Sequence, residues 1–112
     1  MPATFSALTH LDCSRCQDRY EATELQGTCR CGAPLLARYD LRQAGSTASP
    51  EQIASRPPTL WRYHELLPVS QPGAVVSLGE GMTPLLPMAR LGRELGVPGL
   101  LMKDESPLPT GT

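Results

Sequence analysis

Apolar residues occur in short runs separated by turn-forming residues, and the first runs predict a small β unit. Tyr20 to Leu25 can supply an outgoing strand, Gly27 a turn, and Leu35 to Leu41 a returning strand. Gly32, just before the returning strand, permits a sharp change of backbone direction. A fragment this small cannot bury a sufficient core by itself, so a metal or another cross-link is expected to stabilise it.

The middle of the chain predicts short helices within a connection. Residues 43–58 are rich in Gly, Ser, Ala and Pro and read as a linker. Ser49 and Gln52 have the spacing of a capping box, which predicts one helical turn. Residues 60–67 place apolar side chains on one helical face, and we expect Trp61 and Tyr63 to dock this turn onto a larger body, with His64 as a surface or packing residue.

The last third of the chain predicts strand, helix and strand. Residues 74–78 read as a strand, residues 88–95 as a helix that Gly96 ends, and residues 97–102 as a second strand. The second strand is wholly apolar over its last three residues, which is typical of a strand buried on both faces of an α/β sheet. Such a sheet needs more strands than this sequence contains.

Composition and charge exclude several classes of partner. The net charge is -1, and the arginines are scattered along the chain, so no basic patch for nucleic acid or an anionic membrane is predicted. The sequence has no recognisable signal peptide and no apolar run of the roughly 20 residues that span a bilayer. We therefore expect a cytoplasmic protein, in which cysteines bind metal more often than they form disulfides.

Four cysteines in two tight pairs predict a metal site. Cys13 and Cys16 form one pair, Cys29 and Cys31 the other, with the predicted outgoing strand between them. A Cys-x-x-Cys turn places two thiolates on one side of a knuckle, as tetrahedral Zn²⁺ requires. Zinc is favoured over two disulfides because no export signal is present, and over a redox pair because no βαβ pattern surrounds it. Free cysteines, or a site that has lost its metal, remain alternatives. His10 could replace one ligand, but we expect it to be an ordinary strand residue.

Four sequence features, taken together, resemble the threonine synthase family. They are the cysteine pairs, then Leu60-Trp-Arg-Tyr63, then Ser77-Leu-Gly-Glu-Gly-Met-Thr-Pro-Leu85, and finally Lys103-Asp-Glu105 with Pro109-Thr-Gly-Thr112. The resemblance covers the chain from about Leu11 onward. It implies a pyridoxal-phosphate (PLP) enzyme of the tryptophan synthase β-like fold that converts O-phospho-L-homoserine and water to L-threonine and phosphate.

The resemblance also implies an organisation for the chain. Residues 1–42 would be a zinc-ribbon-like unit and residues 43–58 a linker. Residues 59–112 would be the start of the PLP-dependent α/β catalytic domain, so that the fold class is α/β and incomplete. The complete protein would be a homodimer acting on a small molecule.

The family's chemistry depends on a lysine that this chain does not reach. In the family, Phe-Lys follows the Pro-Thr-Gly stretch, and that lysine binds PLP covalently; here it would lie two positions beyond Thr112. We therefore expect no catalytic residue in this chain and no activity from it alone. The residues expected nearest the cofactor are Thr83, Thr110, Gly111 and Thr112.

One position departs from the family pattern, and other functions compete. Leu108 stands where the family often has Asn. Leucine cannot make the hydrogen bond that Asn would offer, and this change affects the expected orientation of the loop and the expected substrate subclass. The alternatives are a free-standing zinc-ribbon binding module, or another PLP lyase such as a threonine dehydratase-like enzyme. Lys103 is the only lysine, and it matches the end of the Lys-Asp-Glu strand, where we expect it to pair with an acidic neighbour.

Overall fold

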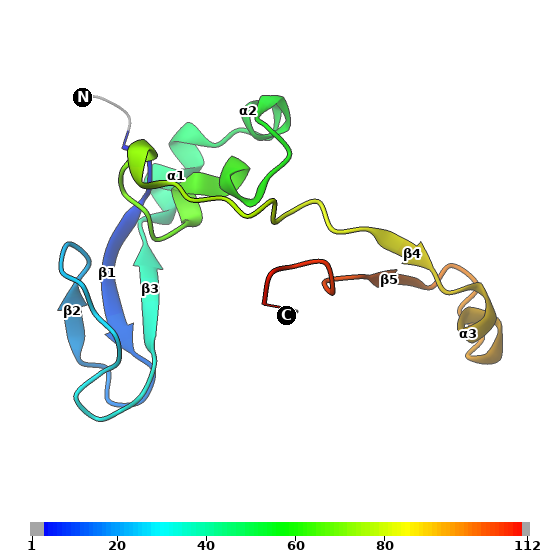
Figure 1. Cartoon of the computed structure of the whole chain (residues 1–112), viewed down its shortest axis with the longest axis horizontal. Coiled ribbons are helices and arrows are strands. Elements are labelled where there is room, and N and C mark those ends of the chain that lie inside the picture. Colours follow the sequence, from blue (N-terminus) through cyan, green and yellow to red (C-terminus); the bar gives the residue numbers. More distant parts are fainter. Residues whose placement is uncertain (1–3, 111–112) are drawn as a thin grey trace. The chain divides into compact units, whose positions relative to one another are not determined.

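The structure is a computed structural model that describes residues 4–110 (Figure 1). The chain divides into two compact units. The first unit contains the residues up to 57 together with 61–75, and the second contains residues 58–60 together with those from 76 onward. The predicted division into a zinc-ribbon-like unit, a linker and a catalytic domain, with boundaries at residues 42 and 58, stays a prediction. Each unit is described by itself.

A three-stranded antiparallel sheet forms the first unit. Its strands are β1 (Leu8–Cys13), β2 (Arg19–Glu21) and β3 (Leu35–Tyr39), in the order β2-β1-β3. The returning strand predicted at residues 35–41 is thus confirmed apart from its last two residues. The outgoing strand predicted at residues 20–25 is wrong in length. Leu25 is fully exposed, so its side chain gains nothing from continuing the sheet, and the chain leaves β2 to reach the second cysteine pair.

The core of this sheet is small and lies at the cysteines. Cys13, Cys29 and Ala33 are buried together, and Tyr20 and Leu35 pack against them. Burial alternates along β3, with Leu35, Ala37 and Tyr39 less exposed than the residues between them, as expected for a strand with one covered face. Because the buried side chains are small, they remove little apolar surface from water, and the hydrophobic effect stabilises the unit only modestly.

Two short helices follow the sheet. Helix α1 (Leu41–Thr47) was not predicted, and Asp40 initiates it by accepting hydrogen bonds from the amides of Arg42 and Gln43. Helix α2 (Pro50–Ser55) begins at the predicted capping box, in which the Ser49 and Gln52 side chains each accept from the other residue's backbone amide. The predicted helical turn is therefore confirmed.

The turn predicted at residues 60–67 is a 3-10 helix, η1 (Leu60–Leu66), with a kink at Tyr63. Its later residues dock on the N-terminal segment. The Ala7 amide donates to the carbonyl of Glu65 at 2.8 Å, and the ring of His64 stacks on that of Phe5 with centroids 4.1 Å apart. Tyr63 is 46% exposed among the described residues, so its docking onto a larger body stays a prediction, while His64 does act as a packing residue.

The strand predicted at residues 74–78 is absent. Residues Pro72–Ala74 form the 3-10 helix η2, and the described chain continues without a strand as far as β4 (Leu85–Pro87). Val76 and Leu78 are about three-quarters exposed, at 73% and 74%. Their β propensity has no effect here, because no neighbouring strand among residues 4–110 pairs with them.

The second unit contains a two-stranded antiparallel sheet and one helix. β4 pairs with β5 (Leu101–Lys103), and α3 (Ala89–Glu94) lies between them in the chain, within the predicted 88–95 helix. Leu101 and Met102 are 54% and 42% exposed, so the burial of this strand on both faces, expected within a larger sheet, stays a prediction. Two strands cannot cover one another's faces, and among residues 4–110 no further strand joins this sheet.

No helix between residues 4 and 110 is both long enough and apolar enough to cross a membrane.

Candidate metal centre and the hollow around Thr83

The first cysteine knuckle is built at the end of the central strand. Cys13 is the last residue of β1, and its amide donates to the carbonyl of Asp18 at 2.8 Å, which closes the turn that carries Cys16. Gln17 sits in this turn with φ +64°, a left-handed conformation. The turn therefore brings the chain back as β2 while both sulfurs stay on its inner side.

The second knuckle precedes β3. The amide of Cys29 donates to the carbonyl of Ala33 at 2.9 Å, and the amide of Gly32 donates to the carbonyl of Cys29 at 2.8 Å. Gly32 has φ +82°, which agrees with the backbone freedom expected of it from the sequence. Pro34 and Leu35 then carry the chain back into the sheet beside Cys13.

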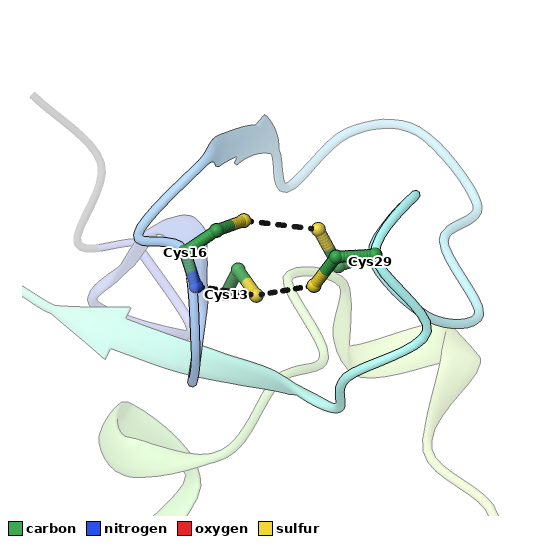
Figure 2. Close-up of side chains that lie close together, drawn as sticks. Cys13, Cys16 and Cys29 are labelled. Carbon is green, nitrogen blue, oxygen red and sulfur yellow. Dashed lines mark hydrogen bonds between the residues drawn. The ribbon is translucent and has the colours of Figure 1, made fainter.

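The two knuckles bring the four thiols together. The sulfur atoms of Cys13, Cys16, Cys29 and Cys31 all lie within 4.8 Å of one another. The Cys13–Cys31 and Cys16–Cys29 sulfur pairs are each 3.5 Å apart. Figure 2 shows the sulfurs of Cys13 and Cys16 directed toward the knuckle that carries Cys29. Four thiolates around a Zn²⁺ ion, with bonds of about 2.3 Å, are separated by about 3.8 Å, so this donor set fits tetrahedral zinc.

The thiols differ sharply in acidity. Hydrogen bonds from the Cys16 and Arg15 amides lower the pKa of Cys13 to about 6. A hydrogen bond from the Asp18 amide also lowers the pKa of Cys16. Hydrogen bonds between Cys16 and the sulfurs of Cys13 and Cys29 together have a larger, opposite effect, and they raise the pKa of Cys16 to about 12. Thiols this close cannot all ionise without a compensating charge, and a bound dication supplies that charge.

His10 lies apart from this cluster, in a group of charges around Asp12. Its Nε2 is 3.3 Å from Asp12 Oδ1, while the Arg38 Nε lies 3.0 Å from the other carboxylate oxygen. The group of metal-ligating side chains found among the described residues contains the four cysteines and not His10. His10 lies in β1, two residues before Asp12, so both side chains lie on the same face of the strand. The expectation that His10 is an ordinary strand residue is therefore confirmed.

A hollow of about 450 Å³ lies within the second unit, and its lining is largely apolar. It is lined by Leu60, Val76, Leu78, Glu80, Gly81, Thr83, Glu105, Leu108, Pro109 and Thr110. Thr83 and Thr110, two of the residues expected near the cofactor, therefore line one hollow. Gly111 and Thr112, the other two, lie outside the described residues.

Two hydrogen bonds fix Thr83 in this hollow. Its hydroxyl donates to Glu105 Oε1 at 2.7 Å, and its carbonyl accepts from the Lys103 ammonium at 2.5 Å. Lys103 thus contacts a backbone carbonyl and not the acidic side chain expected as its partner. Glu105 was not identified as a partner of Thr83, because the two residues are 22 positions apart and only the β4–β5 pairing brings them together.

These lining residues alone do not fit the phosphate of PLP. The described lining carries two carboxylates, on Glu80 and Glu105, and no basic side chain. A phosphate requires clustered amide donors or cations. The hollow can therefore offer an apolar wall and the Thr83 hydroxyl, and it cannot hold the whole cofactor.

The chain is similar in sequence to three proteins that are all named threonine synthase. The chain is 39% identical over 100 residues to a threonine synthase of Methanocaldococcus jannaschii, covering 89% of this chain and 25% of that protein. It is 34% identical over 104 residues to a threonine synthase of Methanosarcina acetivorans, covering 92% and 25%. A threonine synthase of Halalkalibacterium halodurans is 43% identical over 53 residues, covering 47% and 15%.

The other two comparisons were negative. No protein-family profile matches the chain, and no solved structure matches it. The chain spans about a quarter of the length of the first two relatives.

Proposed function

Because the chain is related in sequence to threonine synthases, we propose that it is the N-terminal part of such an enzyme, which converts O-phospho-L-homoserine and water to L-threonine and phosphate. The observation that carries the proposal is the 39% identity over 100 residues, 89% of this chain. A match of that extent includes residues of both compact units. It therefore supports a relationship of the whole chain rather than of a shared zinc-ribbon unit.

In this proposal the second unit contributes one wall of the active site. PLP, when bound, supplies an electron sink for negative charge at the α-carbon of the substrate. The apolar lining, including Leu60, Leu78 and Leu108, would keep water from that side of the site. Thr83 would present a hydroxyl that Glu105 holds in one orientation, and Thr110 lines the same hollow. Gly111 and Thr112 stay proposed neighbours of the cofactor.

The groups that PLP requires most are assigned to the rest of the protein. The lining of the hollow does not fit a phosphate, and Lys103 is engaged by the carbonyl of Thr83. We therefore place the phosphate cradle, the covalent lysine and the partner of the ring nitrogen outside this chain, and assign no catalytic step to its residues.

We also propose that Cys13, Cys16, Cys29 and Cys31 bind one zinc ion with a structural role. Four protein ligands complete a tetrahedral shell and leave no position for water or substrate, which is typical of structural zinc. The small core of the first unit supports this role, because metal binding would contribute of the order of 10 kcal/mol to its folding.

The test of the enzymatic proposal begins with the gene. The nucleotide sequence beyond codon 112 should encode Phe-Lys and a further polypeptide of roughly three times this length, in proportion to the relatives. The protein encoded by the complete reading frame should release phosphate and threonine in equal amounts from O-phospho-L-homoserine. Conversion of threonine to its deaminated 2-oxo acid without phosphate release would instead indicate a dehydratase. A confirmed stop codon after Thr112 would overturn the proposal.

A second candidate is a free-standing zinc-binding module. It is favoured by one observation, that all four thiols and the sheet that positions them lie in one compact unit. A complete reading frame whose product binds one zinc ion per chain and turns over neither substrate would support it.

A further inference from the structure

Tyr20 extends the candidate metal centre beyond its four cysteines. Its hydroxyl donates to the sulfur of Cys29 at 3.2 Å, and the backbone amide of Arg30 donates to the same hydroxyl oxygen at 3.1 Å. A tyrosine hydroxyl has a single proton. Because the amide donor occupies the oxygen from one side, that proton is directed at the sulfur.

The sheet holds this hydroxyl in place. Tyr20 is the middle residue of β2, opposite Leu11 of β1, and its ring packs against the buried cluster of Cys13, Cys29 and Ala33. A side chain fixed at both its backbone and its ring loses little further freedom when its hydroxyl forms a bond. The hydrogen bond to Cys29 is therefore a built feature of the unit and not a chance surface contact.

Both buried sulfurs receive hydrogen bonds from protein donors. Cys13 and Cys29 are each 3% exposed, whereas Cys16 and Cys31 are exposed. Cys13 accepts from the amides of Arg15 and Cys16, and Cys29 accepts from Tyr20. A buried thiolate has lost its water donors, so donors from the protein must replace them.

We infer that Tyr20 is a positioning residue of the metal centre, whose hydroxyl orients Cys29 and stabilises its thiolate as a zinc ligand. The inference rests on the proposed zinc site. Partners that hydrogen-bond to metal ligands typically change metal affinity by about 10- to 100-fold when they are removed. Tyr20 acts through Cys29 and does not itself ligate the metal.

The experiment compares Tyr20→Phe with Tyr39→Phe in the full 112-residue chain. Tyr39 lies in the same sheet but pairs with Leu8, at the end of β1 away from Cys13, so it is a matched control for loss of one hydroxyl. Zinc affinity is measured by competition with a chromophoric chelator. We expect affinity to fall about 10- to 100-fold in Tyr20→Phe and to be unchanged in Tyr39→Phe.

Cobalt substitution supplies a readout that a merely structural role would not move. Loss of a hydrogen bond raises the energy of the sulfur electrons, so the sulfur-to-cobalt charge-transfer band of Tyr20→Phe should move to longer wavelength. Site-specific 3-fluorotyrosine at position 20, a stronger donor of nearly the same shape, should move the band to shorter wavelength. This second variant keeps the test decisive if Tyr20→Phe does not fold.

The outcomes separate the inference from the proposed site. If the unmodified chain binds zinc tightly but the affinity and the cobalt band do not respond to either change at Tyr20, the inference is wrong and the zinc site stands. If the unmodified chain binds neither zinc nor cobalt stoichiometrically, the proposed zinc site itself is wrong.

Discussion

At the scale of single residues, the first unit depends on a few side chains with specific chemistry. Its buried apolar residues are small: Ala7, Cys13, Cys29, Ala33 and Ala44. Burial of alanine and cysteine side chains contributes little of the roughly 25 cal/mol per Å² available from apolar surface, because their area is small. In the proposed zinc site, ligation by the four thiols would supply much of the stability, and polar pairs would add to it.

Replacement of one sulfur tests the ligation directly. In Cys29→Ser we expect the loss of stoichiometric zinc and unfolding of the first unit, because structural zinc contributes of the order of 10 kcal/mol. Metal content by elemental analysis and far-ultraviolet circular dichroism measure the two effects. Ser14→Ala, an exposed change between the first two cysteines, is the control. A Cys29→Ser chain that keeps both its metal and its fold would contradict the proposal.

The buried pair between Arg56 and Glu65 gives a second prediction. Glu65 is 3% exposed, and both of its carboxylate oxygens accept from the Arg56 guanidinium, at 2.5 and 2.8 Å. Removal of one partner of a buried ion pair costs about 3 kcal/mol. We therefore expect Glu65→Gln to lower the melting temperature of the first unit at neutral pH, as measured by circular dichroism.

The same pair predicts a pH dependence with a definite sign. Hydrogen bonds from Arg56 lower the pKa of Glu65 below its ordinary 4.5. A carboxyl with a lowered folded-state pKa stabilises fully above its unfolded value, and this stability disappears as pH falls through the folded value. The difference in melting temperature between the unmodified chain and Glu65→Gln should be constant above about pH 5.5 and shrink below pH 4.5. A difference that grew on acidification would contradict this assignment.

At the scale of elements, two glycines in one segment have different constraints. Gly81 has φ +112°, and an added Cβ would lie 2.7 Å from the amide nitrogen of Leu60. Gly79 has φ +80° with open space around the Cβ position. Gly81 therefore allows two backbone segments of the second unit to approach, and it also satisfies a left-handed conformation.

Alanine at each glycine separates conformational strain from steric conflict. Gly79→Ala should cost about 1 to 2 kcal/mol, the cost of left-handed backbone for a residue with a Cβ. Gly81→Ala carries the same strain and must also displace the Leu60 backbone, so it should destabilise the second unit more. Hydrogen–deuterium exchange of peptides within residues 76–110 should accelerate more in Gly81→Ala. Equal effects would mean that the Leu60 contact is not rigid.

Helices and strands with a local sequence signal were predicted, and those without one were not. The capping box at Ser49, the helix around Leu91 and the strand from Leu35 were predicted, because each has a local signal in adjacent residues. Helix α1 was missed because its signal is the single cap Asp40 before a Gly- and Ser-containing segment. The strands expected at residues 74–78 and 97–102 failed or were shortened, because a strand depends on partners that local sequence cannot reveal.

The candidate site likewise has residues that the sequence could predict and contacts that it could not. The cysteine spacing is local, so the sequence could single out all four thiols. The contacts of Tyr20 with Cys29 and of Thr83 with Glu105 depend on strand pairing and on knuckle geometry, and no spacing rule announces them.

At the scale of the whole molecule, the two units should respond separately to loss of metal. The sheet β2-β1-β3 and the thiols belong to the first unit, while β4, α3 and β5 belong to the second. Addition of a strong chelator should collapse the amide resonances of the first unit and leave those of β4 and β5 unchanged, as two-dimensional NMR can measure. Re-addition of zinc should restore them. Collapse of both sets together would show that the units fold as one.

Exposed apolar residues of the second unit predict self-association of the 112-residue chain. Leu85, Leu95 and Leu101 are 60%, 63% and 54% exposed. A two-stranded sheet with apolar faces and open edges is prone to associate. Sedimentation velocity should show concentration-dependent association that Leu101→Glu reduces. Leu25→Glu, at a fully exposed position in the first unit, should have no effect, and equal effects of both changes would point to net charge as the cause.

The compact arrangement of the first sheet along the chain has a consequence for synthesis. Every strand pairing of this sheet and every thiol of the cluster lies between Leu8 and Tyr39. Contacts at such short sequence separations form early, and domains tend to fold from the N-terminus as a polypeptide leaves the ribosome. If the proposed zinc site forms, the cysteine knuckles would capture the ion while the remaining polypeptide is still being translated, and the supply of zinc during growth would determine what fraction of nascent chains has a folded N-terminal unit.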